Sequence, residues 1–512
     1  MSAPLATVIL AAGLGTRMKS SRAKVLHRVA GRPMIEYPVD LARRLGSERV
    51  ICVLGHQADA VRFAIEGRFG ADSVSVALQA EQRGTGHAVQ QAAPLLEDHN
   101  GLLMVIVGDV PLLTEGTLQR LIDTASAGIL ALVTFTPTVA KGYGRVVRDE
   151  GGKVTRIVEE KDCSDAERRI QECNAGIYCG PSRFIVESLQ SLTPNNAQGE
   201  LYLTDVVEMA ARELAVATIE ASVEEVMGVN DRVELGRADR VMRLRLAEQL
   251  MREGVTVRDP ERLYVEPGIR VGRDTELGPG VELRGSTEIG EGCKIEAGVV
   301  ITDSRVANRV HVKPYCVITE SQVGDDAQIG PWAHLRPGSV LEAEVHLGNF
   351  VETKKTRIGR GSKANHLSYL GDADIGSKVN VGCGTITCNY DGYTKSRTTI
   401  EDGAFIGSDT QLVAPVTVGK NAVVGAGTTV YENVPAGALA LTRTKQIAIA
   451  GYAEKKRKAV EAKAHESKKK PPASEKSASN GHKATHKAIE KTAKKTVKKK
   501  VKKTAAAKSR RR

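Results

Sequence analysis

Residues 265–301 read VEPGIRVGRDTELGPGVELRGSTEIGEGCKIEAGVVI, and every sixth residue of this stretch is aliphatic. The aliphatic positions are Val265, Val271, Leu277, Leu283, Ile289, Ile295 and Ile301, and the spacing returns at Ile400, Ile406, Leu412, Val418, Val424 and Val430. A period of six matches neither a helix face nor the alternation of a strand. It predicts a parallel β-helix in which each hexapeptide forms one side of a coil around a shared core. Glycines that follow these residues, such as Gly272 and Gly278, are expected at tight corners where a Cβ would be strained.

The repeat is interrupted in two ways. Its phase shifts by one residue near Val323 and again near Ile358 and Ile375, and an insertion spans residues 386–397. A regular coil tolerates such a loop only at a corner, and loops thrown out of a β-helix commonly carry function.

Charge is divided unevenly along the 512 residues. The formal net charge is +12, but residues 454–512 alone hold 23 Lys and Arg and 5 Asp and Glu, a net of +18. The rest of the chain therefore carries a net of −6. Basicity is confined to a tail, so the body does not have the charge of a nucleic-acid-binding domain. The aromatic content of 4% suits a narrow core of Val, Ile and Leu.

The eight cysteines contain no C-x-x-C pair and lack the density of a disulfide framework, so we expect reduced, mostly buried thiols. No apolar run approaches the roughly 20 residues of a membrane span. Residues 1–6 lack the basic-then-apolar pattern of a signal peptide. We expect a cytoplasmic protein without a transmembrane segment.

A glycine-bearing turn follows the first apolar run. Residues 5–10 lead into Leu10-Ala11-Ala12-Gly13-Leu14-Gly15-Thr16-Arg17-Met18, and Lys24 comes soon after. Glycines let backbone N–H groups approach phosphate oxygens, and Arg17 and Lys24 can neutralise the phosphate charge. The pattern indicates a polyphosphate site, although a turn that only connects a strand to a helix would look the same.

Helical and strand patterns alternate after this turn. A helix is predicted for residues 33–45, a strand for 49–54, a helix for 57–66 and a strand for 73–79. This alternation favours a Rossmann-like α/β fold with a mostly parallel sheet and a ligand at the carboxyl ends of its strands. Asp109 follows the apolar run 103–107 at that edge. A lone Asp there is commonly a turn residue, but beside a phosphate loop it becomes a candidate metal ligand.

These motifs resemble those of the sugar-nucleotide pyrophosphorylases. The resemblance rests on the LAAGxGTRM turn with Lys24, QxxQxGTGHA at 79–88, GDVP at 108–111, GYGR at 142–145, IVEEKD at 157–162, NAGI at 174–177, NAQGE at 196–200 and GVND at 228–231. Joined to a hexapeptide domain, the set is similar to the family of bifunctional UDP-N-acetylglucosamine pyrophosphorylases and glucosamine-1-phosphate N-acetyltransferases. It covers about residues 5–452.

The resemblance implies an enzyme of two activities. Acetyl transfer from acetyl-CoA to glucosamine 1-phosphate would give N-acetylglucosamine 1-phosphate. Uridylyl transfer from UTP would then give UDP-N-acetylglucosamine and pyrophosphate, which feeds peptidoglycan and lipopolysaccharide precursors. The expected parts are a pyrophosphorylase domain (1–231), a linker helix (232–253), a left-handed β-helix acetyltransferase domain (254–452) and a disordered Lys-rich tail (453–512). A homotrimer is implied, with the acetyl-transfer site between neighbouring β-helices.

For the first domain, the resemblance assigns residues to each part of the substrates. The triphosphate would be held by Leu10, Ala11, Ala12 and Gly13, with Arg17 and Lys24 as catalytic cations. The uracil would be recognised by Gln79, Gly84 and Thr85, and Gly108 would lie beside the nucleotide. The amino sugar would be held by Gly144, Glu159 and Asn174, and one Mg²⁺ would be bound by Asp109 and Asn230. Val107 departs from the family, which often has Tyr before Gly-Asp, and this departure weakens only the expectation that the side chain packs on the nucleotide.

For the second domain, the resemblance assigns His366 as the general base of acetyl transfer, a role that imidazole suits near neutral pH. Arg336 and Lys354 would bind the sugar phosphate, and Lys395 would approach the sugar phosphate or the cofactor from the inserted loop. Tyr369 and Asn380 would bind the sugar hydroxyls, Asn389 and Tyr390 would lie beside the acetyl group, and the coenzyme A channel would be lined by Cys383, Ser408, Ala426 and Arg443. Cys383 stands where Ala is common, and we expect a backbone contact and no catalytic thiol there.

Two other functions stay open. The β-helix would be only a scaffold if the chain carried nucleotidyl transfer alone, although a scaffold does not need His366, Asn389 and Tyr390. The chain would be a basic nucleic-acid-binding protein if its tail dominated, although the acidic body counts against this. For the tail itself, three interpretations remain: a solvated segment, an arm that binds nucleic acid without sequence preference, or contact with an anionic membrane surface.

Overall fold

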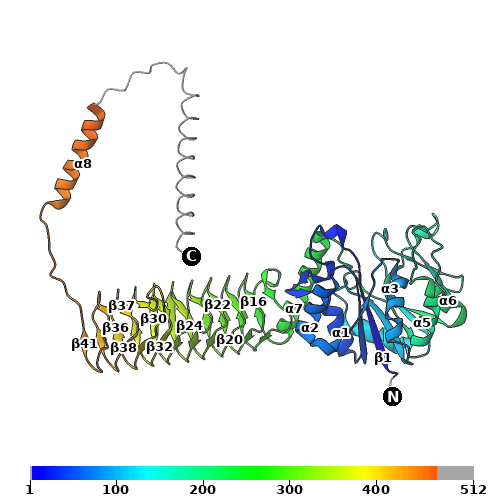
Figure 1. The fold of residues 1–512 in the computed structure, drawn as a ribbon, viewed down its shortest axis with the longest axis horizontal. Helices are drawn as coiled ribbons and strands as arrows, with labels where there is room; N and C mark the ends of the chain where they lie inside the picture. The colour runs from blue at the N-terminus through cyan, green and yellow to red at the C-terminus, as the bar shows by residue number, and fades with distance from the viewer. Residues whose placement is uncertain (1–2, 470–512) are drawn as a thin grey trace, which may run out of the picture. The chain divides into compact units, whose positions relative to one another are not determined.

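Strand β1 (Leu5–Ala11) lies inside the N-terminal sheet and sends alternate side chains to its two faces (Figure 1). Leu5 and Ile9 pack into one apolar core, whereas Ala6 and Val8 pack into the other. The structure, a computed structural model, describes residues 3–469. Burial on both faces is what a sheet between two helix layers requires.

The N-terminal sheet follows the order β11-β7-β10-β6-β1-β4-β5, and β8 and β9 extend from β10. The strands are β1, β4 (Arg49–Leu54), β5 (Ser75–Leu78), β6 (Leu102–Val107), β7 (Leu130–Phe135), β8 (Arg145–Arg148), β9 (Val154–Val158), β10 (Cys173–Pro181) and β11 (Val216–Glu220). Neighbours along this order are parallel, except that β10 runs antiparallel to β6 and β7. The prediction of a mostly parallel sheet is confirmed.

Helices cover both faces of this sheet (Figure 1). One core takes buried residues from α1 (Glu36–Arg44), α2 (Ala58–Phe69) and α4 (Glu115–Ala125). The other takes them from α3 (Thr85–Ala92), α5 (Ser182–Gln190) and α6 (Asp205–Glu213). The strand predicted for residues 49–54 is confirmed, but the helix predicted for 33–45 begins only at Glu36. The reason is a short hairpin, in which β3 (Arg32–Pro33) pairs with β2 (Arg28–Val29) before the helix can start.

A helix, α7 (Arg232–Arg252), stands where the linker helix is predicted for residues 232–253. Asp231 caps its N-terminus, because the Asp231 carboxylate accepts hydrogen bonds from the backbone N–H groups of Val233 and Glu234. The helix contacts β2 on one side and β12, the first strand of the β-helix, on the other. It therefore joins the two folded parts directly.

The β-helix has three parallel sheets, which we call sheets I, II and III. Sheet I contains β12 (Thr256–Val257), β15 (Glu276–Leu277), β18 (Lys294–Ile295), β21 (His311–Val312), β24 (Gln328–Ile329), β27 (His346–Asn349), β30 (Lys363–His366), β33 (Asn380–Val381), β36 (Phe405–Ile406), β39 (Val423–Val424) and β41 (Leu439–Ala440). Sheet II contains β13 (Tyr264–Val265), β16 (Glu282–Arg284), β19 (Val300–Thr302), β22 (Val317–Thr319), β25 (His334–Leu335), β28 (Glu352–Lys354), β31 (Tyr369–Gly371), β34 (Ile386–Cys388), β37 (Gln411–Val413) and β40 (Thr429–Val430). Sheet III contains β14 (Arg270–Val271), β17 (Glu288–Ile289), β20 (Arg305–Val306), β23 (Gln322–Val323), β26 (Val340–Leu341), β29 (Arg357–Ile358), β32 (Ala373–Ile375), β35 (Thr398–Ile400) and β38 (Val416–Val418).

The predicted aliphatic positions from Val265 to Ile301 and from Ile400 to Val430 all belong to one buried core. The glycines beside them are needed for a different reason from the one expected. Gly272 and Gly278 do not have a positive φ; a Cβ on Gly272 would lie 2.5 Å from the carbonyl carbon of Gly290 in the next coil. The constraint is therefore close contact between successive coils.

Every irregularity of the repeat between Leu277 and Val430 falls at one corner, between sheets II and III, which we call corner II/III. The inward residues of β19 and β20, Ile301 and Val306, are five residues apart, so the phase already shifts before the predicted shift at Val323. The insertion is also at this corner. Its boundary was predicted too early, because residues 386–388 form β34 and the loop begins at Asn389.

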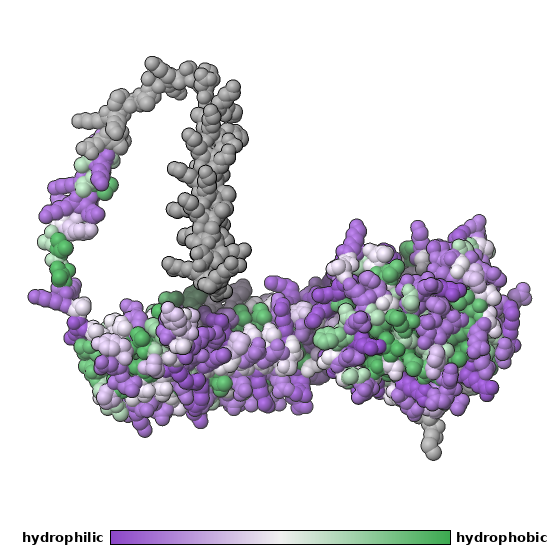
Figure 2. Space-filling view, viewed as in Figure 1, coloured by the Kyte–Doolittle hydropathy of each residue, from purple (hydrophilic) through white to green (hydrophobic). Residues whose placement is uncertain are grey.

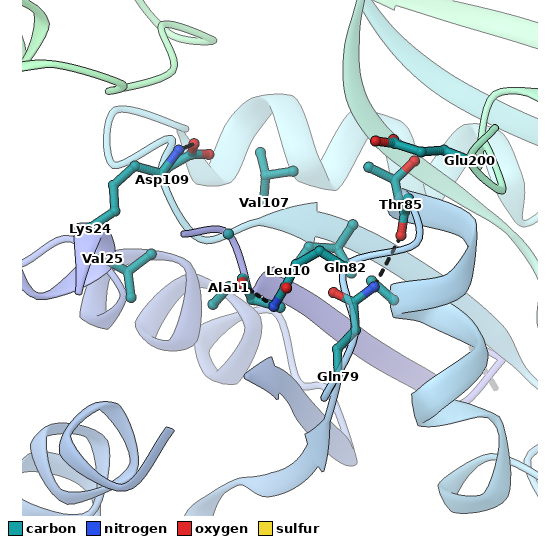
Figure 3. Close-up of a pocket in the computed structure, with 14 residues that line it drawn as sticks. Leu10, Ala11, Lys24, Val25, Gln79, Gln82, Thr85, Val107, Asp109 and Glu200 are labelled. Atoms are coloured by element: carbon teal, nitrogen blue, oxygen red, sulfur yellow. Dashed lines mark hydrogen bonds and ion pairs between the residues drawn. The ribbon is translucent and has the colours of Figure 1, made fainter. Parts of the chain in front are cut away.

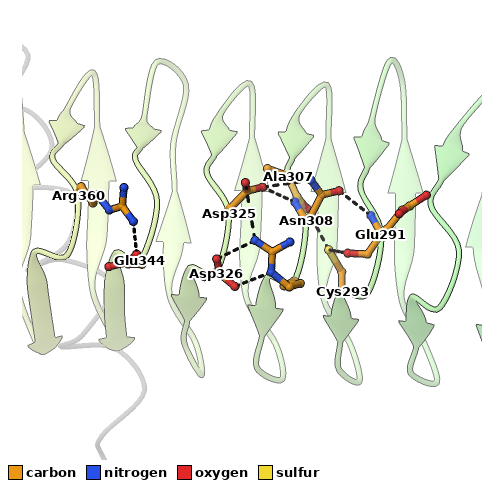
Figure 4. Close-up of polar contacts among 9 residues, drawn as sticks. Glu291, Cys293, Ala307, Asn308, Asp325, Asp326, Glu344 and Arg360 are labelled. Carbon is orange, nitrogen blue, oxygen red and sulfur yellow. Dashed lines mark hydrogen bonds and ion pairs between the residues drawn. The ribbon is translucent and has the colours of Figure 1, made fainter.

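Polar side chains connect successive coils at the corner between sheets III and I (Figure 4). The backbone N–H of Asn308 donates to Asp325 at 2.8 Å, and the Arg309 guanidinium forms two bonds of 2.8 and 2.9 Å with Asp326. Arg360 pairs with Glu344 in the same way further along. Exposed pairs of this kind each contribute little to stability. Figure 2 shows mostly hydrophilic side chains over the visible face of the β-helix, as inward apolar residues require.

All eight cysteines are free thiols, and six are buried, which confirms the expectation of reduced, mostly buried cysteines. Burial raises the pKa of Cys52 to about 12, so this thiol is unreactive near neutral pH. Within residues 3–469, no helix combines the length and the apolarity that crossing a membrane requires.

The unit that starts at Thr444 contains α8 (Tyr452–Lys469). A helix stands here where composition favoured disorder, since Ala, Glu, Lys and Arg have high intrinsic helix propensity and Lys458 pairs with Glu454 one turn away at 2.9 Å. The rest of the predicted tail, residues 470–512, lies outside the described residues. Its contact with nucleic acid or an anionic surface stays a prediction.

Candidate active sites

A cavity of about 280 Å³ opens at the carboxyl ends of β1, β5 and β6 (Figure 3). The chain passes from β1 to β4 and β5 on one side and then to β6 on the other, so the cavity lies where the strand order reverses. Its lining residues are Leu10, Ala11, Ala12, Gly13, Lys24, Val25, Gln79, Gln82, Gly84, Thr85, Ala88, Val107, Asp109 and Glu200. The predicted triphosphate and uracil residues are therefore brought together, with Lys24 and Asp109 at one end and Thr85 and Glu200 at the other (Figure 3).

The glycine-rich turn folds back onto Lys24. Gly15 has φ 63°, and a Cβ there would lie 2.7 Å from the Lys24 Cβ. The Lys24 backbone is fixed in turn, because the N–H of Ala23 donates to Gln57 Oε1 at 2.7 Å. Arg17 lies on the 3₁₀ helix Thr16–Met18 and is exposed, and it is not among the lining residues.

Gln79 is buried at the opposite end. Its Nε2 donates to the Gly84 carbonyl at 3.1 Å and lies 3.1 Å from His87 Nδ1. Gly84 must be glycine, since its φ is 106° and a Cβ would lie 2.4 Å from the Leu201 carbonyl oxygen. Both amide hydrogens of Gln79 are engaged, so its carbonyl oxygen is the group left to meet a ligand.

The two predicted metal ligands meet at Lys24. The Lys24 ammonium forms an ion pair with Asp109 and donates to Asn230 Oδ1 at 3.2 Å. The loop that carries Asn230 is held beside Asp109, because the N–H of Val229 donates to the Asp109 carbonyl at 2.9 Å. Glu234 fixes it further by accepting the Asn230 N–H at 2.6 Å. The two oxygens thus converge on one cation.

The predicted amino-sugar residues form their own group outside the cavity lining. The Asn174 N–H donates to the Gly144 carbonyl at 2.9 Å, and a Cβ on Gly144 would lie 3.4 Å from Glu159 Oε2. Glu159 accepts from Thr204 Oγ1 at 3.3 Å. Burial raises the pKa of Glu159 above its ordinary value. Gly108 lies behind the cavity, where its N–H donates to the Leu10 carbonyl at 2.8 Å.

His366 lies at the corner between sheets I and II, which we call corner I/II. Its Nδ1 is 2.9 Å from Asn349 Oδ1, one coil earlier, and the two residues are partners in the pairing of β27 with β30. An amide oxygen only accepts, so Nδ1 carries the hydrogen and Nε2 keeps the lone pair. Three residues predicted for the coenzyme A channel, Cys383, Ser408 and Ala426, continue the column of His366 on the next coils.

Arg336, Lys354 and Lys395 meet at corner II/III. The pKa of Lys354 is lowered, first by the Lys395 ammonium and then by the Arg336 guanidinium. Asn389 donates to the Asp372 carboxylate at the same corner, and Tyr390 pairs with Lys395 across the inserted loop. Arg336 is also paired with Glu352 at 2.7 Å, and an anion at this corner would stabilise the charge of Lys354.

Two predicted residues lie apart from these groups in one chain. Asn380 is on β33 of sheet I, whereas Tyr369 is on β31 of sheet II, with corner I/II between them. Arg443 follows the last strand and is exposed. One chain therefore presents the predicted acetyl-transfer residues on two sheets and two corners.

A domain model described as MobA-like NTP transferase domain matches residues 7–147. Models described as GMPPB C-terminal domain and bacterial transferase hexapeptide (six repeats) match residues 260–364 and 397–432. Curated proteins named bifunctional protein GlmU, from Trichlorobacter lovleyi and Pelobacter propionicus, are 52% and 50% identical to this chain, and each match covers 88% of this chain and 98% of the relative. This chain belongs to the GlmU family. A solved structure assigned to a glucose-1-phosphate thymidylyltransferase of Bacillus anthracis has a TM-score of 0.39 at 22% identity, covering 46% of this chain and 94% of that chain.

Sequence reasoning missed several polar residues of this GlmU chain. Gln82 and Glu200 line the cavity, although both stand inside motifs that carried the resemblance. Val107 also lines the cavity, so the position that departs from the family does face the ligand space. Asn349 was missed as well, and its signal was the coil length, since it precedes His366 by one coil.

Proposed function

We propose that this chain is a bifunctional enzyme of UDP-N-acetylglucosamine synthesis. Its β-helix transfers an acetyl group from acetyl-CoA to glucosamine 1-phosphate, and its N-terminal domain couples the resulting N-acetylglucosamine 1-phosphate to UTP with release of pyrophosphate. The product supplies peptidoglycan and lipopolysaccharide precursors. The proposal is supported most directly by the presence in one chain of two separate polar centres, a glycine-rich cavity with Lys24 and Asp109 and a β-helix corner with His366.

The N-terminal centre suits a reaction whose barrier is mainly charge repulsion. A phosphate oxygen of the sugar phosphate attacks the α-phosphorus of UTP, and the bond to the bridging oxygen of the β-phosphate breaks as pyrophosphate leaves. The glycine-rich turn supplies backbone N–H groups, and Lys24 supplies a positive charge inside the cavity. Arg17 extends from the same turn and is free to follow the phosphates.

Mg²⁺ fits the residues present at this centre. The Asp109 carboxylate and Asn230 Oδ1 converge on the Lys24 ammonium, which stands in for a cation there. Mg²⁺ is bound in proteins by few oxygen ligands and keeps room for water and substrate phosphates. When bound, it neutralises phosphate charge and orients the triphosphate.

Recognition of the uracil base follows from Gln79. Its amide hydrogens are engaged by Gly84 and His87, so Oε1 is presented to the ligand. Uracil offers the N3–H donor to such an oxygen, whereas cytosine has an unprotonated N3 that would be repelled. The cavity is therefore expected to prefer UTP to CTP.

The β-helix centre suits acetyl transfer to an amine. Nε2 of His366 takes a proton from the amine of glucosamine 1-phosphate, the amine nitrogen forms a bond to the thioester carbonyl carbon, and the carbon–sulfur bond breaks to release coenzyme A as a thiol after protonation. Asn349 holds the tautomer in which Nε2 is basic. We propose that the cations Arg336, Lys354 and Lys395 anchor the phosphate from corner II/III of a neighbouring copy, because the amine and the phosphate of glucosamine 1-phosphate are on adjacent carbons.

We also infer that three copies assemble around the acetyl-transfer sites. Asn380 on sheet I and Arg336 on sheet II face different directions in one chain, and a neighbouring copy would bring such faces together. Contact between sheet I of one copy and sheet II of the next is heterologous, and heterologous contacts form a ring where the rotation between copies closes. A triangular coil gives the ring of three.

An aromatic column at corner I/II supports this assembly. Tyr315, Trp332 and Phe350 stack with centroids 5.6 and 5.7 Å apart on successive coils, and Leu367 continues the column beside His366. All four have positive φ, from 45° to 60°, and all are more than half exposed. Each such residue costs about 1–3 kcal/mol of backbone strain that burial in one chain does not repay. A neighbouring copy that covers the column would offset it.

We propose a cytoplasmic location, because unpaired thiols persist in a reducing compartment. The decisive assay of function supplies glucosamine 1-phosphate, acetyl-CoA, UTP and Mg²⁺ and follows UDP-N-acetylglucosamine. His366→Ala should abolish acetyl transfer alone and Asp109→Ala uridylyl transfer alone. Loss of both activities in either variant, with the protein still folded, would disprove separate centres. For the assembly, Trp332→Ser should yield monomers that retain uridylyl transfer and lose acetyl transfer.

A further inference from the structure

The Lys24 ammonium lies between the two proposed metal ligands. It contacts the Asp109 carboxylate and Asn230 Oδ1, and the side chains of Lys24 and Asp109 are only 15% and 22% exposed. Among the described residues, the structure gives the Asp109 carboxylate no other hydrogen-bond or ion-pair partner. A cation of this chain thus fills the position that a metal would need.

We propose that Lys24 excludes Mg²⁺ from Asp109 and Asn230 until UTP draws the ammonium away, so that metal binding depends on bound nucleotide. The proposal rests on the uridylyl transfer proposed above and concerns the regulation of that site. It makes Lys24 a residue with two partners, the metal ligands in the free enzyme and the phosphates in the complex.

Charge and space prevent both cations from sharing the two oxygens. Two positive charges a few ångströms apart in a partly buried cleft repel each other, and Asp109 supplies only one negative charge to offset them. A metal that entered the free enzyme would have to break the ion pair and leave the ammonium without an anion. Metal affinity of the free enzyme is lowered by that cost.

The surroundings allow the ammonium to move while its backbone stays in place. Ala23 is tied to Gln57, and the Lys24 stem rests on Gly15, where no side chain blocks a change of rotamer. Lys24 already lines the cavity, as does Gly13 of the turn expected to hold the triphosphate. A triphosphate carries several negative charges and is therefore a stronger partner for the ammonium than one carboxylate.

Nucleotide binding and metal binding should each strengthen the other. If UTP releases Asp109 and Asn230 for the metal, the metal must favour UTP binding by the same factor, because the two equilibria are linked. An ion pair that only stabilises the fold would not couple them. Metal affinity without nucleotide is the property that separates the two roles of Lys24.

The test uses the full-length protein and Mn²⁺, whose free concentration electron paramagnetic resonance reports. Without nucleotide, Lys24→Met should bind Mn²⁺ at least tenfold more tightly than the wild type, because a neutral side chain of similar length no longer competes. Lys153→Met, which removes an exposed lysine that has no side-chain contact, is the matched control and should bind as the wild type does. Asp109→Asn added to Lys24→Met should remove the gained affinity.

A second measurement, of UTP binding, should show the opposite effect of the same variant. Equilibrium dialysis of UTP in the presence of Mn²⁺ should show at least tenfold weaker retention by Lys24→Met, since the phosphate contact is lost. Equal or weaker Mn²⁺ binding by Lys24→Met without nucleotide, or unchanged UTP retention, overturns the inference. If Lys24→Met gains affinity that Asp109→Asn does not remove, the metal lies elsewhere and the proposed metal site is wrong instead.

Discussion

Asn349 is predicted to position the general base of acetyl transfer without touching the substrate. Its side-chain oxygen lies 2.9 Å from Nδ1 of His366 and fixes the hydrogen on that nitrogen. Asn349→Leu keeps the size of the side chain but removes the acceptor, so the ring loses both its orientation and its preferred tautomer. A hydrogen bond between neutral groups contributes about 0.5–1.5 kcal/mol, which predicts a kcat/KM for acetyl transfer about 2- to 13-fold lower.

Asn349→Asp tests the same contact through charge. A carboxylate beside the ring favours the protonated, inactive form of the base more than an amide does. The acid limb of the kcat/KM profile for acetyl transfer should therefore move to higher pH, and most of the activity should return above that limb. A purely structural role of Asn349 would lower the rate without moving the limb.

The assay follows coenzyme A release from pH 5.5 to 9.5 with glucosamine 1-phosphate as acceptor, and UDP-N-acetylglucosamine formation from N-acetylglucosamine 1-phosphate as internal control. Gln322→Leu, an exposed amide on sheet III away from His366, is the matched variant and should change neither activity. If both Asn349 variants match the wild type in rate and in the position of the acid limb, the argument from the tautomer is refuted.

Three further outcomes are expected. Glu159→Gln should raise Tm at pH 8 by about 2 °C, the effect of about 1 kcal/mol in a domain of this size, and should raise KM for the sugar phosphate. Burial raises the pKa of Glu159, so the stabilising contribution of this residue is present only at low pH and is lost as pH rises. A Tm difference between the variant and the wild type that does not shrink towards pH 4 would contradict this. Lys395→Ala should raise KM for glucosamine 1-phosphate about tenfold, which is the effect of one charge-assisted hydrogen bond. The loss of substrate affinity at alkaline pH should also move to higher pH, because the Lys395 ammonium no longer lowers the pKa of Lys354. If this alkaline loss of affinity does not move, contact between Lys354 and Lys395 is excluded. Ile318→Ala should destabilise the β-helix by about 2–5 kcal/mol in denaturant titrations, while the unfolding of the N-terminal domain is unchanged. A loss of stability below about 1 kcal/mol would mean that the neighbouring side chains of the coil fill the cavity left by the isoleucine.

The β-helix core could be predicted from the sequence because an aliphatic residue stands at each inward position and these positions recur every six residues. The early phase shift at Val306 could not, since Ala307 occupies the position that a six-residue step from Ile301 would assign, and an apolar residue there conceals the shorter step. The reason for the corner glycines also needed the structure, because a contact between Gly272 and Gly290 depends on coils that stack. The period of the repeat predicts whether a residue faces the core, but it does not predict which atoms of the next coil lie close to that residue.

The candidate sites divide in the same way. Motifs predicted Lys24 and Asp109, since Asp109 comes just after the apolar strand β6 and Lys24 follows the glycine-rich turn after β1, and the carboxyl ends of these strands share one edge of the sheet. Glu200 was not assigned, because its loop is brought to the cavity by backbone hydrogen bonds of Leu201 with Arg83 and Gly86, which are distant in sequence. The ion pair between Lys24 and Asp109 could not be predicted from residue type or spacing, since Lys24 suits a phosphate and Asp109 suits a metal, and neither motif indicates that the two side chains contact each other.

The distribution of irregular steps gives a physical reason for the arrangement of the acetyl-transfer site. From Leu277 to Val430, corner I/II always separates its two inward residues by six positions, whereas corner II/III takes the five-residue steps and the inserted loop. Residues at corner I/II therefore stack in an unbroken column from Asn349 through His366 to Ala426, which an extended acyl carrier can follow over several coils. Corner II/III needs only one local cluster of cations for one phosphate, and a loop there changes no register along the column. A β-helix that placed its insertion at corner I/II would interrupt the column, so the same insertion would separate the base from the carrier.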